Sequence, residues 1–262
     1  MLLAIDIGNT NITIGVYSGE NLGPRWRFAA GQEKMPDEYG ALILNLFERA
    51  GISTKDIDAI VMASVVPSLK GVFAEACSRH LQRVPMVVNG KSKTGIRIQY
   101  EDVGELGADR IVDAAAGYAL YGGPACIVDF GTATTFDAVS AEGDYLGGAI
   151  APGIGISADA LFQRAAKLPK VDLLRPPTAI GKNTVHSLQS GLMFGYVGLV
   201  EGIIARFCAE LGPSTKAIAT GGLAEVIAKE TKAISIVAPW LTLDGLRIIY
   251  DLNAGSQHNR EA

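Results

Sequence analysis

The chain has 262 residues, of which 48% are hydrophobic and 19% charged, a composition that fits a folded globular protein and excludes wholesale disorder. Its length suits one large domain or two small ones. The net charge is −4 and no run of Lys or Arg exceeds two residues, so we expect no nucleic-acid partner, because such a surface needs clustered basic charge.

The first half of the chain predicts three strands and then alternating helices and strands. Turn residues separate three β-rich segments, apolar periodicity follows, and Gly51 ends the first helix. The predicted elements are strands at 2–7, 12–17 and 25–30, a helix at 37–50, a strand at 57–67, a helix at 68–81 and a strand at 85–89. This order is βββαβαβ.

After a loop at 90–108 and a helix that starts there, the same pattern begins again. Three strands are predicted within 124–153, helices at 154–167 and 184–211, a strand at 216–222, a helix just after it, a strand at 234–239 and a last helix at about 241–253.

The two halves can be superimposed on one motif. Asp6-Ile7-Gly8-Asn9 matches Asp129-Phe130-Gly131-Thr132 at an offset of 123 positions (129 minus 6), each after an apolar strand. A chance match of four residues is the alternative. We predict an α/β fold of two duplicated domains, 1–115 and 116–262, with a ligand cleft between them.

The paired hairpins have the chemistry of a phosphate site. Gly8 allows the backbone N–H groups to approach phosphate oxygens, and the polar residues after it add donors. Asp6 would repel a phosphate, so we expect it to face a cation, most simply hydrated Mg²⁺. Asp129 is its counterpart on the second hairpin. Two ordinary β-turns are the alternative, since the same residue types are common there.

Two further segments suit a nucleotide. The run GTATTFD at 131–137 is rich in small and hydroxylated residues, and Gly221 and Gly222 could leave bare backbone for an adenosine. A tight strand-to-helix turn explains those two glycines equally well.

Two other motifs are rejected. Gly90-Lys91-Ser92 looks like the end of a P-loop, but Pro85 stands five positions before Gly90, where a P-loop needs glycine. The glycines at 153 and 155 imitate a dinucleotide-binding motif, but they do not follow the first strand of a βαβ unit.

Gly107-Ala108-Asp109-Arg110 stands at the start of a predicted helix. Asp109 could be a general base for a substrate hydroxyl and Arg110 a clamp for a carboxylate. In the alternative interpretation Asp109 is only the N-cap of that helix.

Cysteine usage indicates a cytoplasmic protein. Cys77, Cys126 and Cys208 lie far apart in apolar stretches without a CxxC pair, which predicts buried reduced thiols.

The segment MLLAIDIGNT lacks the basic region of a signal peptide. The most apolar stretch, 191–204, contains Glu201 and is too short and Gly-rich to span a bilayer, so we expect no membrane contact. The histidines share no metal-ligand spacing: His80, His186 and His258.

DIGNTN at 6–11, GADR at 107–110, DFGTATTFD at 129–137 and GGAIAPG at 147–153 together resemble the type III pantothenate kinases, which have the actin-like, ribonuclease H-like ATPase fold. The resemblance extends to about residue 250. It implies phosphorylation of the primary hydroxyl of pantothenate by ATP to 4'-phosphopantothenate, the first step of coenzyme A biosynthesis.

The resemblance also implies roles for single residues. Asp109 would be the catalytic base, Asp129 would bind a monovalent cation, K⁺ or NH₄⁺, and Asp6 would lie near Mg²⁺. The implied ATP-binding residues are Asp6, Ile7, Gly8, Asn9, Thr10, Asn11, Ile12, Thr13 and Thr132. The implied pantothenate-binding residues are Tyr100, Gly107, Ala108, Asp109, Arg110 and Thr184. Val103 departs from the family, which usually has proline there, and this puts only the shape of its loop in doubt.

The family works as a homodimer, and the helix at 184–211 has more apolar residues than one buried stripe requires: Leu188, Leu192, Phe194, Val197 and Leu199. A helix buried within each monomer is the alternative.

Two other functions stay open at this point. A kinase for another small hydroxylated acceptor would keep the hairpins and differ at Tyr100, Arg110 and Thr184. A nucleotide-binding transcriptional accessory protein of the same fold would act through a partner, but a pure binder has no use for the acidic residues at 6, 109 and 129.

Overall fold

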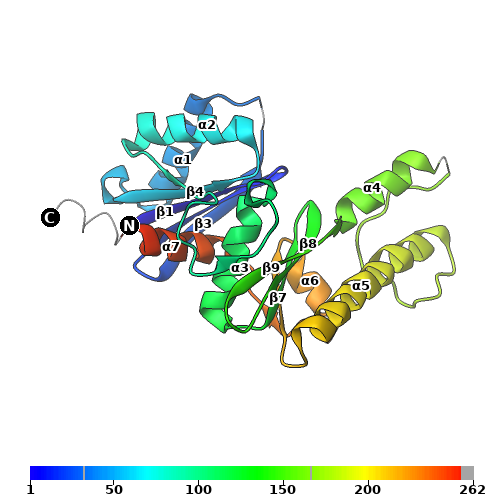
Figure 1. Cartoon of the computed structure of the whole chain (residues 1–262). Helices are drawn as coiled ribbons and strands as arrows, with labels where there is room; N and C mark the ends of the chain where they lie inside the picture. Colours follow the sequence, from blue (N-terminus) through cyan, green and yellow to red (C-terminus); the bar gives the residue numbers. More distant parts are fainter. Residues whose placement is uncertain (32, 166, 255–262) are drawn as a thin grey trace. The chain divides into compact units, whose positions relative to one another are not determined.

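The computed structural model describes residues 1–31, 33–165 and 167–254, and divides the chain into two compact units (Figure 1). The first comprises residues 1–120 together with 241–254, and the second residues 121–240. His258 lies outside the described residues.

The first unit is built on a five-stranded sheet of order β3-β2-β1-β4-β5. Its strands are β1 (Leu2–Ile7), β2 (Asn11–Ser18), β3 (Asn21–Ala29), β4 (Ala59–Ser64) and β5 (Met86–Val87). The central β1 is antiparallel to β2 and parallel to β4. Helices cover it, which explains why β1 is apolar almost throughout.

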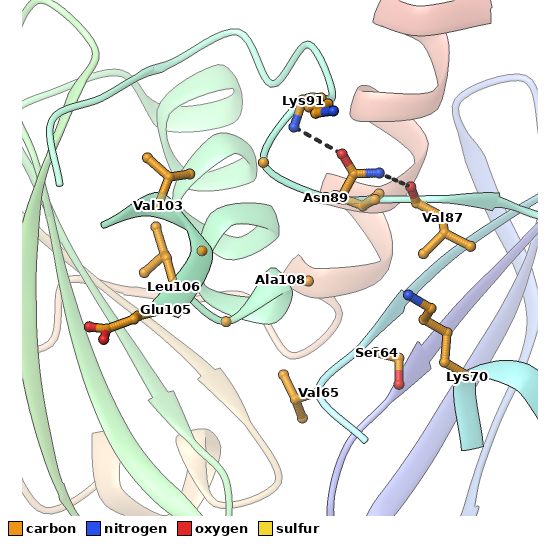
Figure 2. Close-up of a pocket in the computed structure, with 14 residues that line it drawn as sticks. Ser64, Val65, Lys70, Val87, Asn89, Lys91, Val103, Glu105, Leu106 and Ala108 are labelled. Atoms are coloured by element: carbon orange, nitrogen blue, oxygen red, sulfur yellow. Dashed lines mark hydrogen bonds between the residues drawn. The ribbon is translucent and has the colours of Figure 1, made fainter. Parts of the chain in front are cut away.

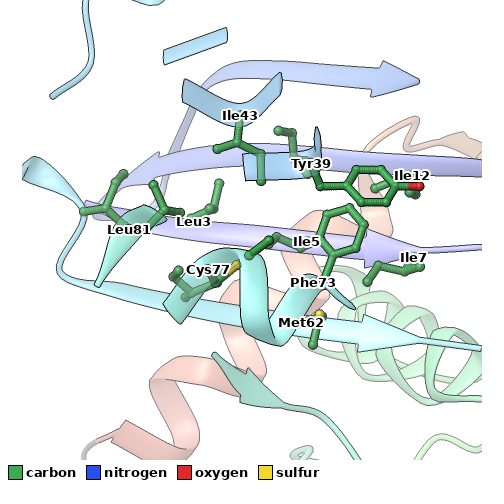
Figure 3. Close-up of a cluster of buried hydrophobic side chains, with 14 of the residues drawn as sticks. Leu3, Ile5, Ile7, Ile12, Tyr39, Ile43, Met62, Phe73, Cys77 and Leu81 are labelled. Atoms are coloured by element: carbon green, nitrogen blue, oxygen red, sulfur yellow. The ribbon is translucent and has the colours of Figure 1, made fainter. Parts of the chain in front are cut away.

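One face of this sheet carries the main core of the unit. Side chains alternate along a strand, so Leu3, Ile5 and Ile7 share a face, and they pack with Tyr39 and Phe73 (Figure 3). The helices on this face are α1 (Pro36–Ala50) and α2 (Pro67–Ala76), which is followed by a π turn (Cys77–Leu81). Burial raises the pKa of Cys77 to about 12, as expected for an inert thiol.

The terminal helix α7 (Leu241–Ala254) belongs to this first unit. The sequence-based boundary, which placed residues 116–262 together, is wrong at this point. The Tyr17 hydroxyl donates to Asp244 Oδ1 at 2.7 Å, and Leu243 packs against Gly15 on the face of β2 opposite the main core. Helix α3 (Ala108–Tyr121) lies beside α7, where Gly245 meets Val112. Short-range patterns reveal a helix but not the sheet on which it packs.

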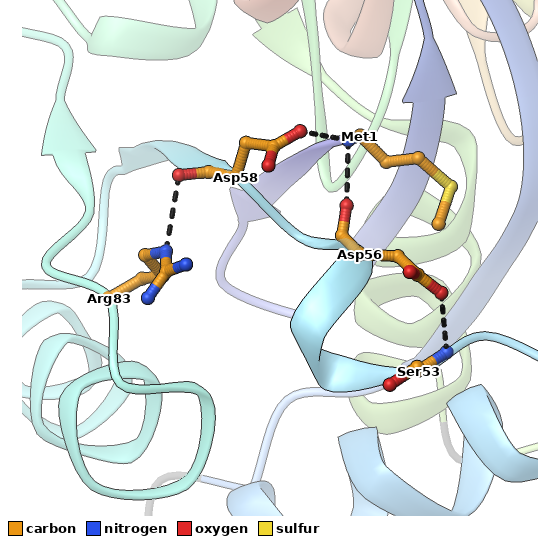
Figure 4. A network of polar contacts seen from close by, with 5 residues as sticks. All are labelled: Met1, Ser53, Asp56, Asp58 and Arg83. Carbon is orange, nitrogen blue, oxygen red and sulfur yellow. Dashed lines mark hydrogen bonds and ion pairs between the residues drawn. The ribbon is translucent and has the colours of Figure 1, made fainter.

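Polar contacts join the start of β1 to the segment before β4 (Figure 4). The Met1 ammonium group contacts the Asp58 carboxylate at 2.5 Å and the Asp56 carbonyl at 2.7 Å. Asp56 in turn accepts from the Ser53 backbone at 3.1 Å, and Arg83 donates to the Asp58 carbonyl. These contacts fix the beginning of the two parallel central strands.

The strands that belong to the second unit follow the corresponding order, β9-β8-β7-β10-β11, within a six-stranded sheet. These strands are β7 (Ala125–Phe130), β8 (Ala133–Val139), β9 (Asp144–Pro152), β10 (Lys216–Gly221) and β11 (Ile236–Val237), and the unit's helices are α4 (Ile154–Arg164), α5 (Thr184–Leu211) and α6 (Ala224–Ala228). The α/β class with two sheets is confirmed. Shorter elements are η1 (Thr54–Asp56), β6 (Arg97–Ile98) and η3 (Val103–Glu105).

Helix α5 has 28 residues and is, by length and composition alone, long and apolar enough to cross a membrane. The stretch 191–204, which was expected to be too short for a membrane span, is only part of this helix, so length alone does not exclude a span by the whole helix. One face nevertheless packs in the core of the second unit through Met193, Val200 and Ile204. Packing of a core helix accounts for the apolar content of that face.

Candidate active site

The first candidate element is the turn between β1 and β2. Asp6 pairs with Thr13 and with Ala63 across the two neighbours of β1. The Gly8 backbone donates to the Asn11 carbonyl at 3.0 Å, and a β-carbon on Gly8 would lie 3.0 Å from that same oxygen. This close turn favours glycine, which has no β-carbon to crowd that oxygen, and it leaves three exposed polar residues at its tip: Asn9, Thr10 and Asn11.

Not every residue predicted to bind ATP presents its side chain there. Ile7 and Ile12 are fully buried in the core, and the Thr13 hydroxyl accepts from Arg27 Nε at 3.3 Å. These positions hold the turn in shape, and Ile7 and Ile12 could meet a ligand only through their backbone.

The equivalent turn in the second unit joins β7 and β8, where Asp129 pairs with Thr135 and with Thr220. A β-carbon on Gly131 would lie 3.2 Å from Asp129 Oδ2, and one on Gly221 would collide with Asp129 Oδ1. Two glycines, Gly131 and Gly221, therefore lie close to this carboxylate. Thr132, at the tip, is exposed.

A tyrosine from α5 supports this turn, which sequence reasoning missed. The Tyr196 and Thr134 hydroxyls share a short hydrogen bond, and the Tyr196 ring lies 6.2 Å from that of Phe130. Burial raises the pKa of Tyr196, and the hydrogen bond to Thr134 opposes that rise. This contact joins α5 to β8, two elements far apart in the sequence, so no local sequence pattern indicates it.

Gly107, Ala108, Asp109 and Arg110 stand at the start of α3. Because α3 begins at Ala108, Asp109 lies in the first turn and is not the N-cap. Its Oδ1 accepts from the Arg110 backbone N–H at 2.8 Å. Burial raises the pKa of Asp109, while that hydrogen bond and the Arg110 charge oppose the rise. A carboxylate with a raised pKa is a better proton acceptor at neutral pH than an ordinary one.

A pocket of about 910 Å³ lies beside this helix start, and all its lining residues belong to the first unit (Figure 2). It is lined by residues 64–65, 70, 87–91 and 103–108. Residues 64–65 and 87–91 of this set lie at the carboxyl ends of the parallel strands β4 and β5, where ligands of open α/β sheets usually bind. Gly107 and Ala108 thus line a real cavity, whereas Arg110 is buried and is not among the lining residues.

The loop around Val103 forms a 3-10 turn. Asp102 caps this turn by accepting from the Gly104 backbone at 2.8 Å, and Val103 is its first residue. Proline, the residue expected there from the family resemblance, suits the first position of a helical turn. In this chain valine occupies the first position of the turn.

The remaining predicted substrate residues are separated between the units. Tyr100 is half-buried in the first unit, and Thr184 is the exposed first residue of α5 in the second. Asn183 caps α5 by accepting from the His186 backbone at 2.8 Å. Within the described residues no group of three or more His, Cys, Asp or Glu side chains could hold a metal ion by itself.

The fold resembles that of several solved structures at low sequence identity. One is a conserved protein from Campylobacter jejuni assigned to the Baf family of transcriptional activators (TM-score 0.63, 20% identity, 97% of this chain and 99% of that one). Another is a 2-dehydro-3-deoxygalactonokinase protein from Sinorhizobium meliloti (TM-score 0.60, 12% identity, 95% and 98%). A third is the activator of 2-hydroxyisocaproyl-CoA dehydratase from Clostridium difficile, with bound ADPNP (TM-score 0.56, 12% identity, 100% and 97%). The fold is thus that of the actin-like ATPases and related kinases.

Sequence comparison identifies the family within that class. The family model described as type III pantothenate kinase matches residues 2–206. Curated type III pantothenate kinases from Roseiflexus sp. (strain RS-1) and Moorella thermoacetica are each 54% identical over 253 residues, covering 97% of this chain and 99% and 100% of theirs. The relative from Myxococcus xanthus is 52% identical over 256 residues, with 98% and 100% coverage. The chain belongs to the type III pantothenate kinase family.

Proposed function

We propose that the chain transfers the γ-phosphoryl group of ATP to the primary hydroxyl of pantothenate, the first step of coenzyme A biosynthesis. The observation that carries this proposal is the carboxylate of Asp109, which is held at the start of α3 beside a cavity with its pKa raised by burial. Membership of the family identifies the acceptor.

In the proposed reaction Asp109 accepts the proton of the acceptor hydroxyl. The hydroxyl oxygen forms a bond to the γ-phosphorus while the bond from that phosphorus to the β–γ bridging oxygen breaks. ADP leaves with the electron pair of that bond, and the proton passes from Asp109 to solvent. Phosphoryl transfer depends chiefly on positioning and charge neutralisation, and a general base contributes typically about 10²–10⁴-fold.

The first hairpin is proposed to hold the ATP phosphates through the backbone of residues 6–13, with Thr132 also contacting the nucleotide. Asp6 would hold the Mg²⁺ that accompanies ATP, through water. Magnesium in such sites takes one or two carboxylates together with phosphate oxygens and water, so a single acidic side chain is adequate. The ion supplies charge neutralisation at the phosphates when it is bound.

The monovalent cation, K⁺ or NH₄⁺, is proposed to bind at Asp129. The fit is supported by the bare backbone around this carboxylate, since the Phe130 carbonyl also lies close to where a Gly221 β-carbon would be. A carboxylate flanked by backbone carbonyls is an oxygen-rich site suited to a hard cation. Such an ion would stabilise the negative charge of the turn.

The residues proposed to contact pantothenate are Tyr100, Gly107, Ala108, Arg110 and Thr184.

A cytoplasmic location and a homodimer formed through α5 are part of the same proposal. Leu188 and Val197, which the sequence suggested for a dimer face, are instead buried within the second unit. The exposed side of α5 carries Gly191, Gly195 and Gly198.

The deciding experiment measures ADP formation from ATP and Mg²⁺, with and without pantothenate and K⁺, and with a panel of sugars as alternative acceptors. We expect ADP only when pantothenate is present, and more with K⁺ than without it. Turnover with a sugar, and none with pantothenate, would identify the sugar as the acceptor. ATP binding without transfer to any acceptor would favour a regulatory protein and would overturn the proposal.

A further inference from the structure

A buried carboxylate in the second unit takes no part in the proposed mechanism. Asp137 lies on β8, and only 1% of its surface is exposed. Its Oδ1 accepts from the Tyr145 hydroxyl at 2.7 Å and its Oδ2 from the Thr135 hydroxyl at 3.3 Å. Burying a carboxylate is unfavourable for folding, and an apolar residue would fill the same space without that penalty. The presence of Asp137 therefore indicates a role other than packing.

Asp137 lies close to the turn that carries Asp129. Thr135 pairs with Asp129 across β8 and β7, and it lies two positions before Asp137 on the same strand. Directly paired residues share one face of a sheet, as do residues two positions apart on a strand. The side chains of Asp129, Thr135 and Asp137 therefore share a face, opposite the face that carries Val128 and Phe136 into the core.

The Thr135 hydroxyl has a single proton, which it donates to Asp137. An ionised carboxylate can only accept, so this proton cannot come from Asp137 and is not directed at Asp129. The Thr135 oxygen thus keeps lone pairs beside the Asp129 carboxylate, because the β-carbons of directly paired residues lie about 4.5–5.5 Å apart. Neighbouring oxygen acceptors of this kind suit a hard cation.

We infer that the Thr135 hydroxyl oxygen is a second protein ligand of the monovalent cation at Asp129, and that Asp137 is the positioning residue that turns this oxygen toward the ion. Tyr145 holds Asp137 in turn from β9. The inference rests on the proposed function, which assigns K⁺ or NH₄⁺ to Asp129. An acceptor oxygen serves both ions, because it can coordinate K⁺ or accept an N–H from NH₄⁺.

The test measures K⁺ binding apart from catalysis, in the presence of ATP and Mg²⁺ and without pantothenate. KCl replaces N-methylglucamine chloride at constant ionic strength, and the rise in thermal unfolding midpoint reports binding. The wild type should be stabilised by K⁺ in a saturable way. Thr135→Val keeps the shape but removes the oxygen, and should raise the K⁺ concentration for half of the effect at least about tenfold, since even a partner of a metal ligand typically contributes about 10–100-fold to affinity. Thr135→Ser keeps the hydroxyl and should stay close to the wild-type value.

Asp137→Asn tests the positioning role. Because Tyr145 donates to one end of the side chain, the amide oxygen should stay there and the N–H group should face Thr135, where it would occupy the lone pairs that the cation needs. K⁺ affinity should fall about tenfold, and the K⁺ concentration that half-activates kcat should rise in proportion. KM for pantothenate at saturating K⁺ should stay unchanged, which separates this role from a general loss of structure.

Thr231→Val is the matched control. The Thr231 hydroxyl also donates to a carboxylate, that of Glu201 at 2.6 Å, but it lies in the loop before β11. Its removal should leave the K⁺ response unchanged. If Asp137→Asn does not fold, Tyr145→Phe releases Asp137 from the other end and should weaken K⁺ binding in the same direction.

A wild type that responds to K⁺, together with folded Thr135 and Asp137 variants that respond identically, overturns the inference and leaves the proposed phosphoryl transfer intact. A wild type whose unfolding midpoint and kcat are both insensitive to K⁺ overturns the cation site and the inference together. ADP formation with pantothenate decides the reaction independently of either result.

Discussion

The carboxylate of Asp129 occupies the space where a β-carbon on residue 221 would have to lie. Gly221 ends β10, one position beyond Thr220, which pairs with Asp129 on β7. Its φ of +90° is also strained for any other residue. Asp129 and Gly221 thus form a matched pair, because a side chain at position 221 would displace the carboxylate.

Gly221→Ala should therefore lower both stability and activity. A side chain in the left-handed region costs about 1–3 kcal/mol, and the displaced carboxylate should weaken activation by K⁺. Gly212→Ala is the matched control, because Gly212 has φ +104° but no atom within 4 Å of a β-carbon. Thermal unfolding and the K⁺ dependence of kcat are measured for both. If both variants lose K⁺ activation equally, the collision with Asp129 is not the cause.

Asp109→Asn should abolish turnover without harming the fold. The amide oxygen can still accept from the Arg110 backbone N–H, but it cannot take a proton from a hydroxyl. We expect a loss of at least about 10²-fold in kcat, with ATP protection against thermal unfolding retained. A folded variant with near-normal kcat would remove Asp109 from the mechanism.

The same substitution should also leave the protein at least as stable at neutral pH. The pKa of Asp109 is raised by burial, so the folded state binds its proton more tightly than the unfolded state does. Stability from this group is thus present at low pH and is lost as pH rises through the unfolded and then the folded pKa. At neutral pH the charged form is disfavoured by folding, and the neutral amide avoids that cost. A clear drop in unfolding midpoint for Asp109→Asn at pH 7 would contradict this reading.

The pH dependence of kcat/KM gives a separate check on Asp109. A base must be deprotonated, so activity should fall as pH decreases through its pKa. That acidic limb should lie above the ordinary value for aspartate, about 3.9. The residual activity of Asp109→Asn should not show this acidic fall in kcat/KM. A wild-type profile whose acidic fall has an apparent pKa of about 3.9 or lower would argue that another group is the base.

Local sequence patterns were sufficient to predict the hairpins and the long helices, but they did not predict which other elements these pack against. The motif around Asp6 and its repeat around Asp129 identified the two turns, because an apolar strand followed by Asp and Gly is a local signal. The attachment of α7 to the first sheet depends on contacts such as Tyr17 to Asp244, which are 227 positions apart. Tyr196 was missed for a similar reason, because its hydrogen-bond partner Thr134 lies 62 positions away in the sequence.

The exposed side of α5 offers a test of the proposed homodimer. Gly195 and Gly198 are exposed, and a β-carbon on either meets nothing within 4 Å. The buried side of the helix, with Met193 and Val200, faces the core of its own unit. A side chain at Gly198 therefore has room within the monomer, and replacing glycine in a helix improves helix propensity by about 0.5–1 kcal/mol.

Gly198→Arg should thus leave the monomer folded and disrupt association. An uncompensated charge in an interface costs about 3–5 kcal/mol, which corresponds to at least about a hundredfold weaker dimer. Sedimentation velocity over a range of concentrations measures the shift from dimer to monomer, and circular dichroism confirms the fold. Ala141→Arg, in the exposed turn after β8, adds the same side chain elsewhere and should leave association unchanged. A Gly198→Arg protein that remains as dimeric as the Ala141→Arg control would place the interface on another surface, because an arginine could not be accommodated at the centre of a close-packed helix contact.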